Sequence, residues 1–272
     1  MTAVPALPAA TVTLVRDTAQ GVEVLMLQRN HQSGFMPGMF LFPGGAVDAG
    51  DAAAEVAARC KGLDDDAASA ALGLASGGLP YWAAAIRESF EEAAVLLACD
   101  AGGRLVNPRD PARLDRFEEY RRKLNAGEED LRVMLELEDL TLAVDHLTYF
   151  SHWITPVTAP RRYDTRFFVA VAPEGQEAAP DNVEAIHHVW LSAGAAVDRY
   201  GSGEYKMRTP TIRTLEMFAA FDTTAALIAG LRAQVSIPAM LPRIAPTGAR
   251  LLPGDPGYDE LAKLEAQGQW KT

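Results

Sequence analysis

The feature that most constrains this chain is an arginine followed by three glutamates within residues 87–92, Arg-Glu-Ser-Phe-Glu-Glu. Positions i, i+3 and i+4 share one face of a helix, so Glu88, Glu91 and Glu92 converge there. The opposite stripe is apolar and should face the core: Trp82, Ile86, Phe90 and Leu97. Three carboxylates on one face repel each other, and a hard divalent cation such as Mg²⁺ or Mn²⁺, which takes oxygen ligands, would compensate that repulsion. The spacing therefore predicts a helix over about 80–99 that carries a metal site.

A glycine turn upstream weighs against the alternative, a solvated acidic face on an amphipathic helix. A strand-like step ends in Phe42-Pro43, and Gly44 and Gly45 follow it directly. Glycine allows backbone N–H groups to approach a phosphate closely, so these two residues are candidate substrate contacts. The alanine-rich stretch that comes next predicts one or two short helices over 51–76.

The glycine turn and the acidic helix together resemble the two halves of the sequence motif, or box, of the Nudix hydrolase family. This box reads G-x5-E-x7-R-E-U-x-E-E-x-G-U, in which U is a bulky apolar residue. The match begins at Gly45, Asp51 stands at the first acidic position, and Ala94 replaces the final glycine. Residues 52–86 replace the short spacer of the family, which is tolerable because loop-closure entropy grows slowly with length. We expect the helix to continue past Ala94 through the apolar run 93–98.

The resemblance implies an α/β fold, a Nudix-type α/β/α sandwich with a mixed sheet, extended by helical insertions and C-terminal helices. It implies that Glu88, Glu91 and Glu92 hold Mg²⁺ or Mn²⁺ against a diphosphate, where the metal neutralises charge and lowers the pKa of the attacking water. Arg87, Glu91 and Glu92 are the catalytic candidates of the box. Glu184, which precedes a predicted strand, is the candidate base from a later loop.

Two further stretches resemble the branch of the family that contains peroxisomal coenzyme A diphosphatases. Residues 151–169 carry a W-x-T-P and a Y-D-T-x-F-F pattern. Residues 25–45 match the spacing of an upstream coenzyme A pattern at Arg29 and at 42–45, whereas Gly34 stands where a second arginine is usual. The candidate cations for the substrate's phosphates are Arg29, Arg161, Arg162 and Arg166. The alternative, exposed arginines at a strand end, stays open for the last three.

Hydrophobic periodicity and turn residues place the remaining elements in one domain spanning 1–272. Strands are expected over 11–16, 22–28, 146–154, 166–172 and 184–191. Helices are expected as a pair within 110–138, broken at 125–127, and over 210–220 and 223–234. The core covers about 10–235, with insertions at about 52–79 and 108–140 and a proline-rich arm at about 237–272.

The charge of the chain narrows its class of partners. The formal net charge is −11, so the chain lacks the basic footprint that a nucleic acid or a membrane surface needs. Its start does not resemble a signal peptide, and no apolar run reaches the length of a membrane span. The two cysteines are too few for a disulfide framework and are expected to be reduced. We therefore expect a cytoplasmic protein.

These expectations lead to one main function and several alternatives. The main one is metal-dependent hydrolysis of a diphosphate linkage in a small-molecule nucleoside diphosphate derivative, with coenzyme A or an acyl-CoA as one substrate. ADP-ribose, a nucleotide sugar or a dinucleotide are alternative substrates. A second class is a Nudix-fold module that holds a nucleotide without cutting it, which Asp51 and Ala94 favour and the intact glutamates disfavour. The helices of 110–138 and the C-terminal helices could also form a homodimer interface.

Overall fold

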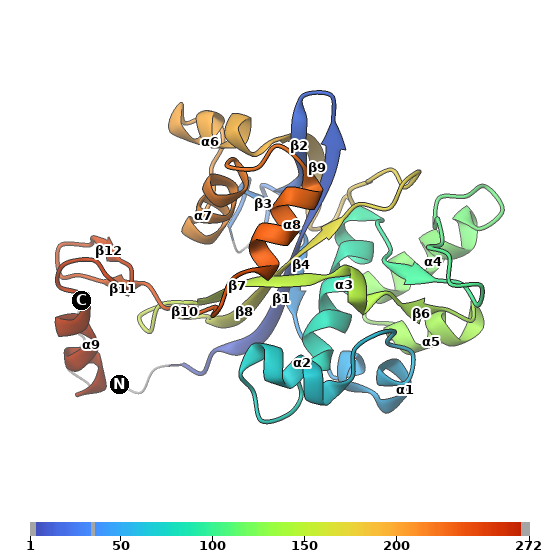
Figure 1. The fold of residues 1–272 in the computed structure, drawn as a ribbon, viewed down its shortest axis with the longest axis horizontal. Coiled ribbons are helices and arrows are strands. Elements are labelled where there is room, and N and C mark those ends of the chain that lie inside the picture. Colours follow the sequence, from blue (N-terminus) through green and yellow to red (C-terminus); the bar gives the residue numbers. More distant parts are fainter. Residues whose placement is uncertain (1–3, 34–35, 268–272) are drawn as a thin grey trace.

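The structure, a computed structural model, describes residues 4–33 and 36–267, so Gly34 lies outside it. A mixed sheet between two helical layers organises these residues (Figure 1). Its eight described strands are β1 (Leu7–Thr18), β2 (Gly21–Arg29), β3 (Phe40–Leu41), β4 (Gly44–Ala46), β7 (Thr148–Ile154), β8 (Tyr163–Val171), β9 (Ala185–Ser192) and β10 (Ala239–Met240). Their order is β10-β7-β8-β1-β2-β3, with β4 paired to β1 and β9 paired to β2. The predicted α/β sandwich with a mixed sheet is confirmed.

The long strand β1 sits near the middle of the sheet and exchanges partners along its length. Its first half pairs antiparallel with β4 and its last residues pair antiparallel with β2, whereas β8 runs parallel beside most of it. Ala10 consequently lies opposite Gly45 on one neighbour and Arg166 on the other. Residues opposite each other in neighbouring strands face the same side of a sheet. This register brings the glycine turn against the centre of the sheet.

Both faces of the sheet are covered, which explains the near-continuous apolar run of β2. Leu25 and Leu27 belong to the core on the α3 side, and Val24 and Met26 belong to the core on the α6–α8 side. The helices of the first side are α1 (Ala54–Ala57), α2 (Asp65–Leu72), α3 (Leu79–Ala93), α4 (Leu114–Asn125) and α5 (Leu131–Leu137). Those of the second side are α6 (Ala193–Gly201), α7 (Thr209–Phe218) and α8 (Thr224–Arg232). Figure 1 shows these two groups on opposite sides of the strands.

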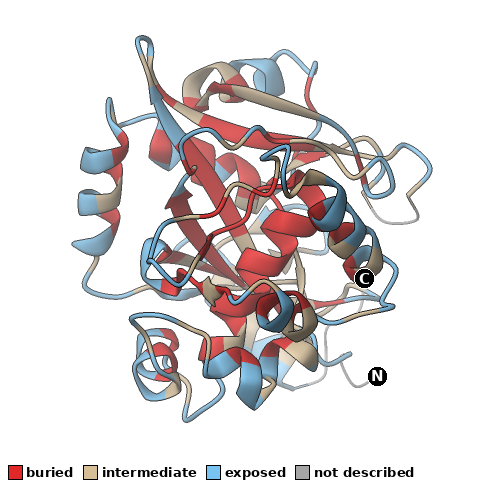
Figure 2. Cartoon of the chain, turned by 90° about the vertical axis from the view of Figure 1, so that its right-hand side faces the viewer, coloured by how far each residue is buried: buried red, intermediate tan, exposed pale blue. Residues whose placement is uncertain are grey.

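Helix α3, which carries the arginine and the glutamates, is buried on nearly every side. Its residues are buried except for Pro80, and this includes the acidic face. The predicted insertions cause this, because α1 and α2 precede α3 while α4 and α5 follow it, and all four contact it or its neighbours. Figure 2, viewed from the side of the insertions, shows buried segments enclosed by the exposed outer faces of surrounding helices. The glutamates therefore do not form a solvated helix face.

The expectation that this helix continues past Ala94 is wrong. Helix α3 ends at Ala93, and Ala94 adopts a left-handed conformation with φ of 57°. The N–H of Ala94 bonds to the Phe90 carbonyl, and the N–H of Val95 bonds to the Ser89 carbonyl. These bonds satisfy carbonyls that the end of a helix leaves free. Alanine thus occupies the left-handed cap that glycine usually fills, and the chain turns into a short strand, β5 (Ala98–Cys99), paired with β6 (Thr141–Leu142).

The other predicted elements are present with small shifts of their bounds. The hairpin of β1 and β2, the pair α4 and α5, strands β7, β8 and β9, and helices α7 and α8 all match expected segments. Helix α6 was not predicted; it follows β9 directly, and the available signal was Ser192, whose side chain caps the helix by accepting the N–H of Ala195. The C-terminal arm contains more regular structure than an extended wrap, namely β10, β11 (Arg243–Ile244), β12 (Arg250–Leu251) and α9 (Tyr258–Ala266). Residues 268–272 of the arm lie outside the described part.

Two simpler expectations concern membrane spans and cysteines. No helix within the described residues combines the length and hydropathy needed to cross a bilayer. Both Cys60 and Cys99 are free thiols, as expected. Burial raises the pKa of the Cys60 thiol to about 12, so it stays protonated at neutral pH.

Candidate active site

Arg87 forms the centre of the candidate site, and all of its donor groups are engaged. Its Nε and Nη2 donate to the two carboxylate oxygens of Asp51 at 2.9 and 3.0 Å. Its Nη1 donates to Glu88 at 2.9 Å and to Glu91 at 3.1 Å, and its Nη2 also donates to the Ala46 carbonyl at 2.8 Å. The guanidinium fork suits such bidentate binding of a carboxylate. Asp51, despite its shorter side chain, therefore reaches Arg87 across the insertion.

The glycine turn meets the acidic face of α3 directly. The Gly44 N–H donates to Glu92 Oε2 at 3.0 Å. A Cβ atom at Gly45 would lie 2.4 Å from Glu88 Oε1, closer than real Cβ contacts permit. Glycine is required here because the backbone of β4 passes against the carboxylate. The two halves of the motif, separated by residues 52–86, are thus brought together in space.

The carboxylates of the site share a low-dielectric environment. Burial raises the pKa of Glu88 to about 8, with Arg87 opposing the shift and Glu91 adding to it. Burial likewise raises the pKa of Asp51 and of Glu91, against the attraction of Arg87. For Glu92, burial and the nearby Glu88 raise the pKa well above its usual value, and the Gly44 N–H opposes them. Each of these groups would ionise more readily beside an added positive charge.

Glu184 lies at the edge of this cluster and is paired with Arg29. Arg29 Nη2 donates to Glu184 Oε2 at 2.8 Å, and about half of the Glu184 side chain is exposed. The negative charge of Glu184 contributes to the raised pKa of Glu92, so the two carboxyl groups are near each other. Asp181 accepts the N–H of Glu184 and fixes the loop before β9. The structure therefore brings together Arg29 and Glu184, which lie 155 residues apart in the chain.

The other three candidate cations do not join the cluster. Arg162 is buried, and its Nη1 donates to the Val4 carbonyl at 2.7 Å. Arg166 is also buried, and its Nη1 donates to the Leu72 carbonyl at 3.0 Å. Arg161 is exposed and lies over the ring of a neighbouring tyrosine. The two buried arginines are structural, since Arg162 bonds to the segment before β1 and Arg166 bonds to the last residue of α2.

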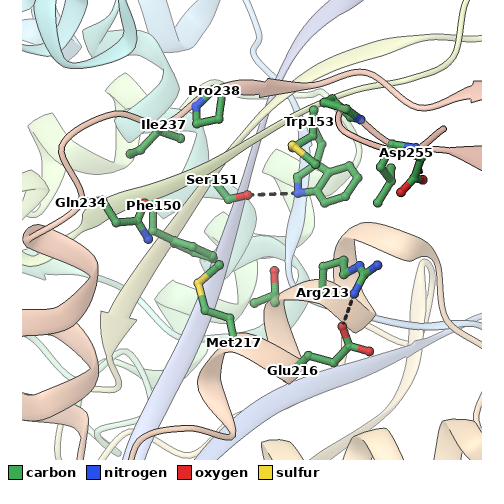
Figure 3. Close-up of a pocket in the computed structure, with 14 residues that line it drawn as sticks. Phe150, Ser151, Trp153, Arg213, Glu216, Met217, Gln234, Ile237, Pro238 and Asp255 are labelled. Atoms are coloured by element: carbon green, nitrogen blue, oxygen red, sulfur yellow. Dashed lines mark hydrogen bonds and ion pairs between the residues drawn. The ribbon is translucent and has the colours of Figure 1, made fainter. Parts of the chain in front are cut away.

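Two cavities differ in their position relative to the candidate site. One of about 590 Å³ lies on the side of the sheet opposite to α3 (Figure 3), where the Trp153 indole donates to Ser151 and Arg213 pairs with Glu216. These four polar side chains thus bond in pairs, and the cavity lies on the other side of the sheet from the glutamates. A second cavity of about 430 Å³ lies at the carboxyl end of α3; its lining is Glu118, Arg121, Arg122, Asn125, Ala126, Asp181 and Val183. Only the second adjoins the candidate site.

Comparison with known proteins decides the family. A sequence model of the NUDT19 Nudix domain matches residues 63–217, which is more than half of the chain. The chain belongs to the Nudix hydrolase family. The matched range includes the Arg-Glu-x-x-Glu-Glu half of the Nudix box, and the glycine half precedes it. Arg87, Glu88, Glu91 and Glu92 thus stand at Nudix box positions within a matched Nudix domain.

Two relatives and one solved structure show how far the similarity extends. The chain is 32% identical to the chicken (Gallus gallus) "Acyl-coenzyme A diphosphatase NUDT19", over 88% of this chain and 73% of the relative. It is 30% identical to the human protein of the same name, over 89% of this chain and 74% of the relative. The crystal structure of a Nudix hydrolase from Alicyclobacillus acidocaldarius covers 86% of this chain and 99% of its own, with a TM-score of 0.71 and 28% identity.

The donor set of the Nudix box fits a divalent cation in its chemistry. The site holds four buried carboxylates, of which Asp51, Glu88 and Glu91 bond to the guanidinium of Arg87 and Glu92 accepts the Gly44 N–H. When ionised, these carboxylates carry more negative charge than the guanidinium balances. Carboxylate oxygens are also the ligands that Mg²⁺ and Mn²⁺ prefer. In the described residues no three acidic, histidine or cysteine side chains are already arranged as a metal cage. Glu88 and Glu91 instead turn toward Arg87, and Glu92 toward Gly44.

Several residues of the site carry no obvious signal in the sequence. Asp48 lies 3.6 Å from Arg87 and its N–H donates to Asp51, so it continues the ion-pair network. Its acidic position just after the glycine turn was the available clue. Arg121 and Asn125 from α4 both donate to the Glu91 carbonyl. Nothing in the local pattern of α4 separates these two from its other polar residues, because their partners are distant backbone atoms.

Proposed function

We propose that this Nudix hydrolase splits the diphosphate linkage of coenzyme A or an acyl-CoA, a nucleoside diphosphate derivative. One observation carries the chemistry: Gly44 and Gly45 lie against Glu92 and Glu88, so a phosphate binding surface and an acidic cluster coincide. The substrate class is supported by the two relatives named as acyl-coenzyme A diphosphatases. The glycine-bearing strand would contribute backbone contacts to the diphosphate, and the glutamates the charge that its metal requires.

In this proposal Glu88, Glu91 and Glu92 would hold Mg²⁺ or Mn²⁺. Such a metal, when bound, neutralises the charge of the diphosphate and lowers the pKa of a water molecule. The protein's own groups then have separate tasks. Arg87, whose donors are all engaged within the site, keeps Glu88, Glu91 and Asp51 in place and acts as a positioning residue. Its expected catalytic role is accordingly indirect.

Proton transfer is assigned to a carboxylate at the edge of the cluster. Glu184 is the candidate base, because its side chain is half exposed and lies near Glu92. The hydrogen bond from Arg29 Nη2 holds its carboxylate at the edge of the cluster, within reach of a bound substrate. Arg29 is the one predicted phosphate-binding cation that reaches the site. A substrate phosphate and Glu184 would share this guanidinium.

The competing hypothesis of a non-catalytic Nudix module loses its two supports. Asp51 was expected to alter the contact with Arg87, yet it binds the guanidinium through both oxygens. Ala94 was expected to remove the sharp end of the helix, yet α3 ends there in a left-handed cap. Neither departure from the family pattern therefore supports the non-catalytic module. The homodimer interface and the cytoplasmic location stay predictions.

A substrate panel with product masses tests the proposal. Coenzyme A, an acyl-CoA, ADP-ribose, a nucleotide sugar and a dinucleotide are incubated with the protein and Mg²⁺ or Mn²⁺, and mass spectrometry identifies the bond that broke. We expect cleavage of the coenzyme A compounds at the diphosphate and no turnover with EDTA. Glu91→Gln and Glu92→Gln should each lower kcat by roughly 100-fold or more.

The control for these variants is Glu119→Gln. Glu119 is an exposed residue of α4 whose carboxylate pairs with Arg122, away from the Nudix box. An exposed ion pair contributes little to stability, so kcat should stay at the wild-type value. Wild-type turnover by both Glu91→Gln and Glu92→Gln would contradict the proposed mechanism. Binding of a nucleotide without any phosphate-containing product would favour the module instead.

A further inference from the structure

Each of the two insertions bonds to one end of helix α3. At the start of α3, Asp65 from α2 accepts the N–H groups of Gly77 and Leu79, and Ser69 Oγ accepts the N–H of Gly78. These are the donors that a helix start leaves unpaired, and the residue at the N-cap position has no side chain to satisfy them. The first insertion thus supplies a capping carboxylate from another helix.

The second insertion bonds to the other end, next to the glutamates. Arg121 Nε from α4 donates to the Glu91 carbonyl at 2.7 Å, and Asn125 Nδ2 donates to the same oxygen at 3.3 Å. The Ala93 carbonyl accepts the N–H of Ala179 at 2.9 Å. The last turn of α3 is therefore held by residues from two distant segments. Its bonded carbonyl belongs to Glu91, a residue that also carries one of the proposed metal-binding carboxylates.

Arg121 also bonds to the loop that leads to Glu184. Its Nη2 donates to the Ala179 carbonyl at 2.7 Å, so one guanidinium joins the end of α3 to residues 179–184. The side chain is buried, and its nearest carboxylate, that of Glu118, is 3.9 Å away. The partners of this buried cation are thus mainly two backbone carbonyls. The planar guanidinium has donors at fixed positions, so it sets the distance between the two carbonyls, which the single ammonium group of a lysine cannot do.

We propose that Arg121 is a positioning residue, which fixes the carboxyl end of α3 relative to the loop carrying Glu184. It would thereby set the spacing between the metal-binding glutamates and the base. This inference builds on the proposed function, because it gives the helical insertion a role in that site. Outer partners that orient metal-binding groups commonly affect metal affinity by 10- to 100-fold.

The first experiment measures amide hydrogen exchange in metal-free protein, so it does not depend on activity. Arg121→Met removes the fork, Arg121→Lys retains the charge, and Asp65→Asn weakens the cap at the opposite end of α3. We expect Arg121→Met to accelerate exchange at both 91–95 and 179–184. Asp65→Asn should accelerate exchange at 77–82 and leave the other two segments as they are. Arg121→Lys should fall between Arg121→Met and wild type.

The second experiment measures the Kd of Mn²⁺ by electron paramagnetic resonance for the same three variants. Arg121→Met should raise the Kd by roughly 10- to 100-fold, with partial recovery in Arg121→Lys. Asp65 caps α3 at Leu79, which lies about 18 Å from Glu91 along the helix at a rise of 1.5 Å per residue, so Asp65→Asn should leave the Kd unchanged while lowering Tm. Where Arg121→Met does not fold, Arg121→Lys against Asp65→Asn makes the same comparison.

The outcomes separate this inference from the proposed function. Exchange at 91–95 and 179–184 that stays at the wild-type rate in both Arg121 variants would overturn the inference, whatever the enzyme does. A Kd for Mn²⁺ that stays at the wild-type value while Tm falls equally in Arg121→Met and Asp65→Asn would reduce Arg121 to a structural role. Absence of Mn²⁺ binding by the wild-type protein would count against the proposed function, and the exchange data would still decide the inference.

Discussion

Gly45 illustrates how little space the site leaves around its carboxylates. Any side chain at this position would meet Glu88, since the nearest oxygen is 2.4 Å from an added Cβ. The neighbouring Gly44 meets the backbone of β1 in the same way, at 2.6 Å from the Ala10 carbonyl. The two glycines are therefore fixed by different neighbours. Gly44 permits the pairing of β4 with β1, and Gly45 permits the approach of α3.

This difference leads to a prediction for Gly45→Ala. The added methyl group should displace the Glu88 carboxylate, and a misplacement of about 1 Å can lower a rate by roughly 100-fold. We expect kcat to fall by about that factor, measured in the diphosphatase assay. Gly194→Ala is the matched control, because nothing lies within 4 Å of its added Cβ and it sits in helix α6. Equal activity of the two variants would contradict the prediction.

At the scale of single elements, helix α3 shows what the sequence can and cannot predict. The ion pairs that make Arg87 a positioning residue reach Asp51 across the insertion and were not predicted, whereas the acidic face and the apolar stripe of the helix follow from spacing. Its end does not, because the bonds that fix it come from Arg121 and from the Ala179 N–H, which are distant in the chain. The run 93–98 is equally apolar in a helix and in a buried strand, so periodicity could not distinguish them.

Two arginines, Arg162 just before strand β8 and Arg166 within it, show a second limit of prediction from sequence. The pattern around Arg162 and Arg166 was recognisable, and their burial was not. Both donate to backbone carbonyls, those of Val4 and Leu72. Every residue has a backbone carbonyl, so the residue types in the sequence do not reveal these partners. The motif match therefore located residues 151–169 but did not predict the hydrogen-bond acceptors of these two arginines. Arg29, in contrast, was placed by the spacing of the coenzyme A pattern, which runs from its strand to the glycine turn.

The left-handed cap of α3 allows a prediction at this scale. Ala93 and Ala94 are both buried alanines, yet only Ala94 has a positive φ. Left-handed backbone costs an ordinary residue about 1–2 kcal/mol, which glycine avoids. We therefore expect Ala94→Gly to be more stable than Ala93→Gly by about 1–2 kcal/mol, since both lose the same methyl group. Denaturant unfolding of the two variants measures this difference, and equal midpoints would refute it.

At the scale of the whole molecule, stability is linked to the proposed metal through the buried carboxylates. Burial raises the pKa of Glu88 from 4.5 to about 8, so the folded metal-free protein keeps a proton that the unfolded chain releases at lower pH. Between these two values the unfolded state binds fewer protons, and stability falls as pH rises. A cation that binds the ionised carboxylates removes this penalty.

We accordingly expect the rise in Tm produced by Mg²⁺ to be larger at about pH 8 than at about pH 6. Thermal unfolding with Mg²⁺ and with EDTA at both pH values gives the two differences. Glu92→Gln removes one of the carboxylates and should reduce the shift at the higher pH. A Mg²⁺-induced shift that does not depend on pH would show that ionisation of these groups is not coupled to binding.

The contact between Asp51 and Arg87 has a consequence for how such sites are found. Thirty-five residues intervene, yet the two side chains meet at 2.9 Å, as they would across a short connection. The reacting geometry depends on where two anchors are held, and the path of the chain between them is free to lengthen into whole helices. A search that demands a set number of intervening letters would overlook this molecule, whereas one that compares interatomic separations would retrieve it.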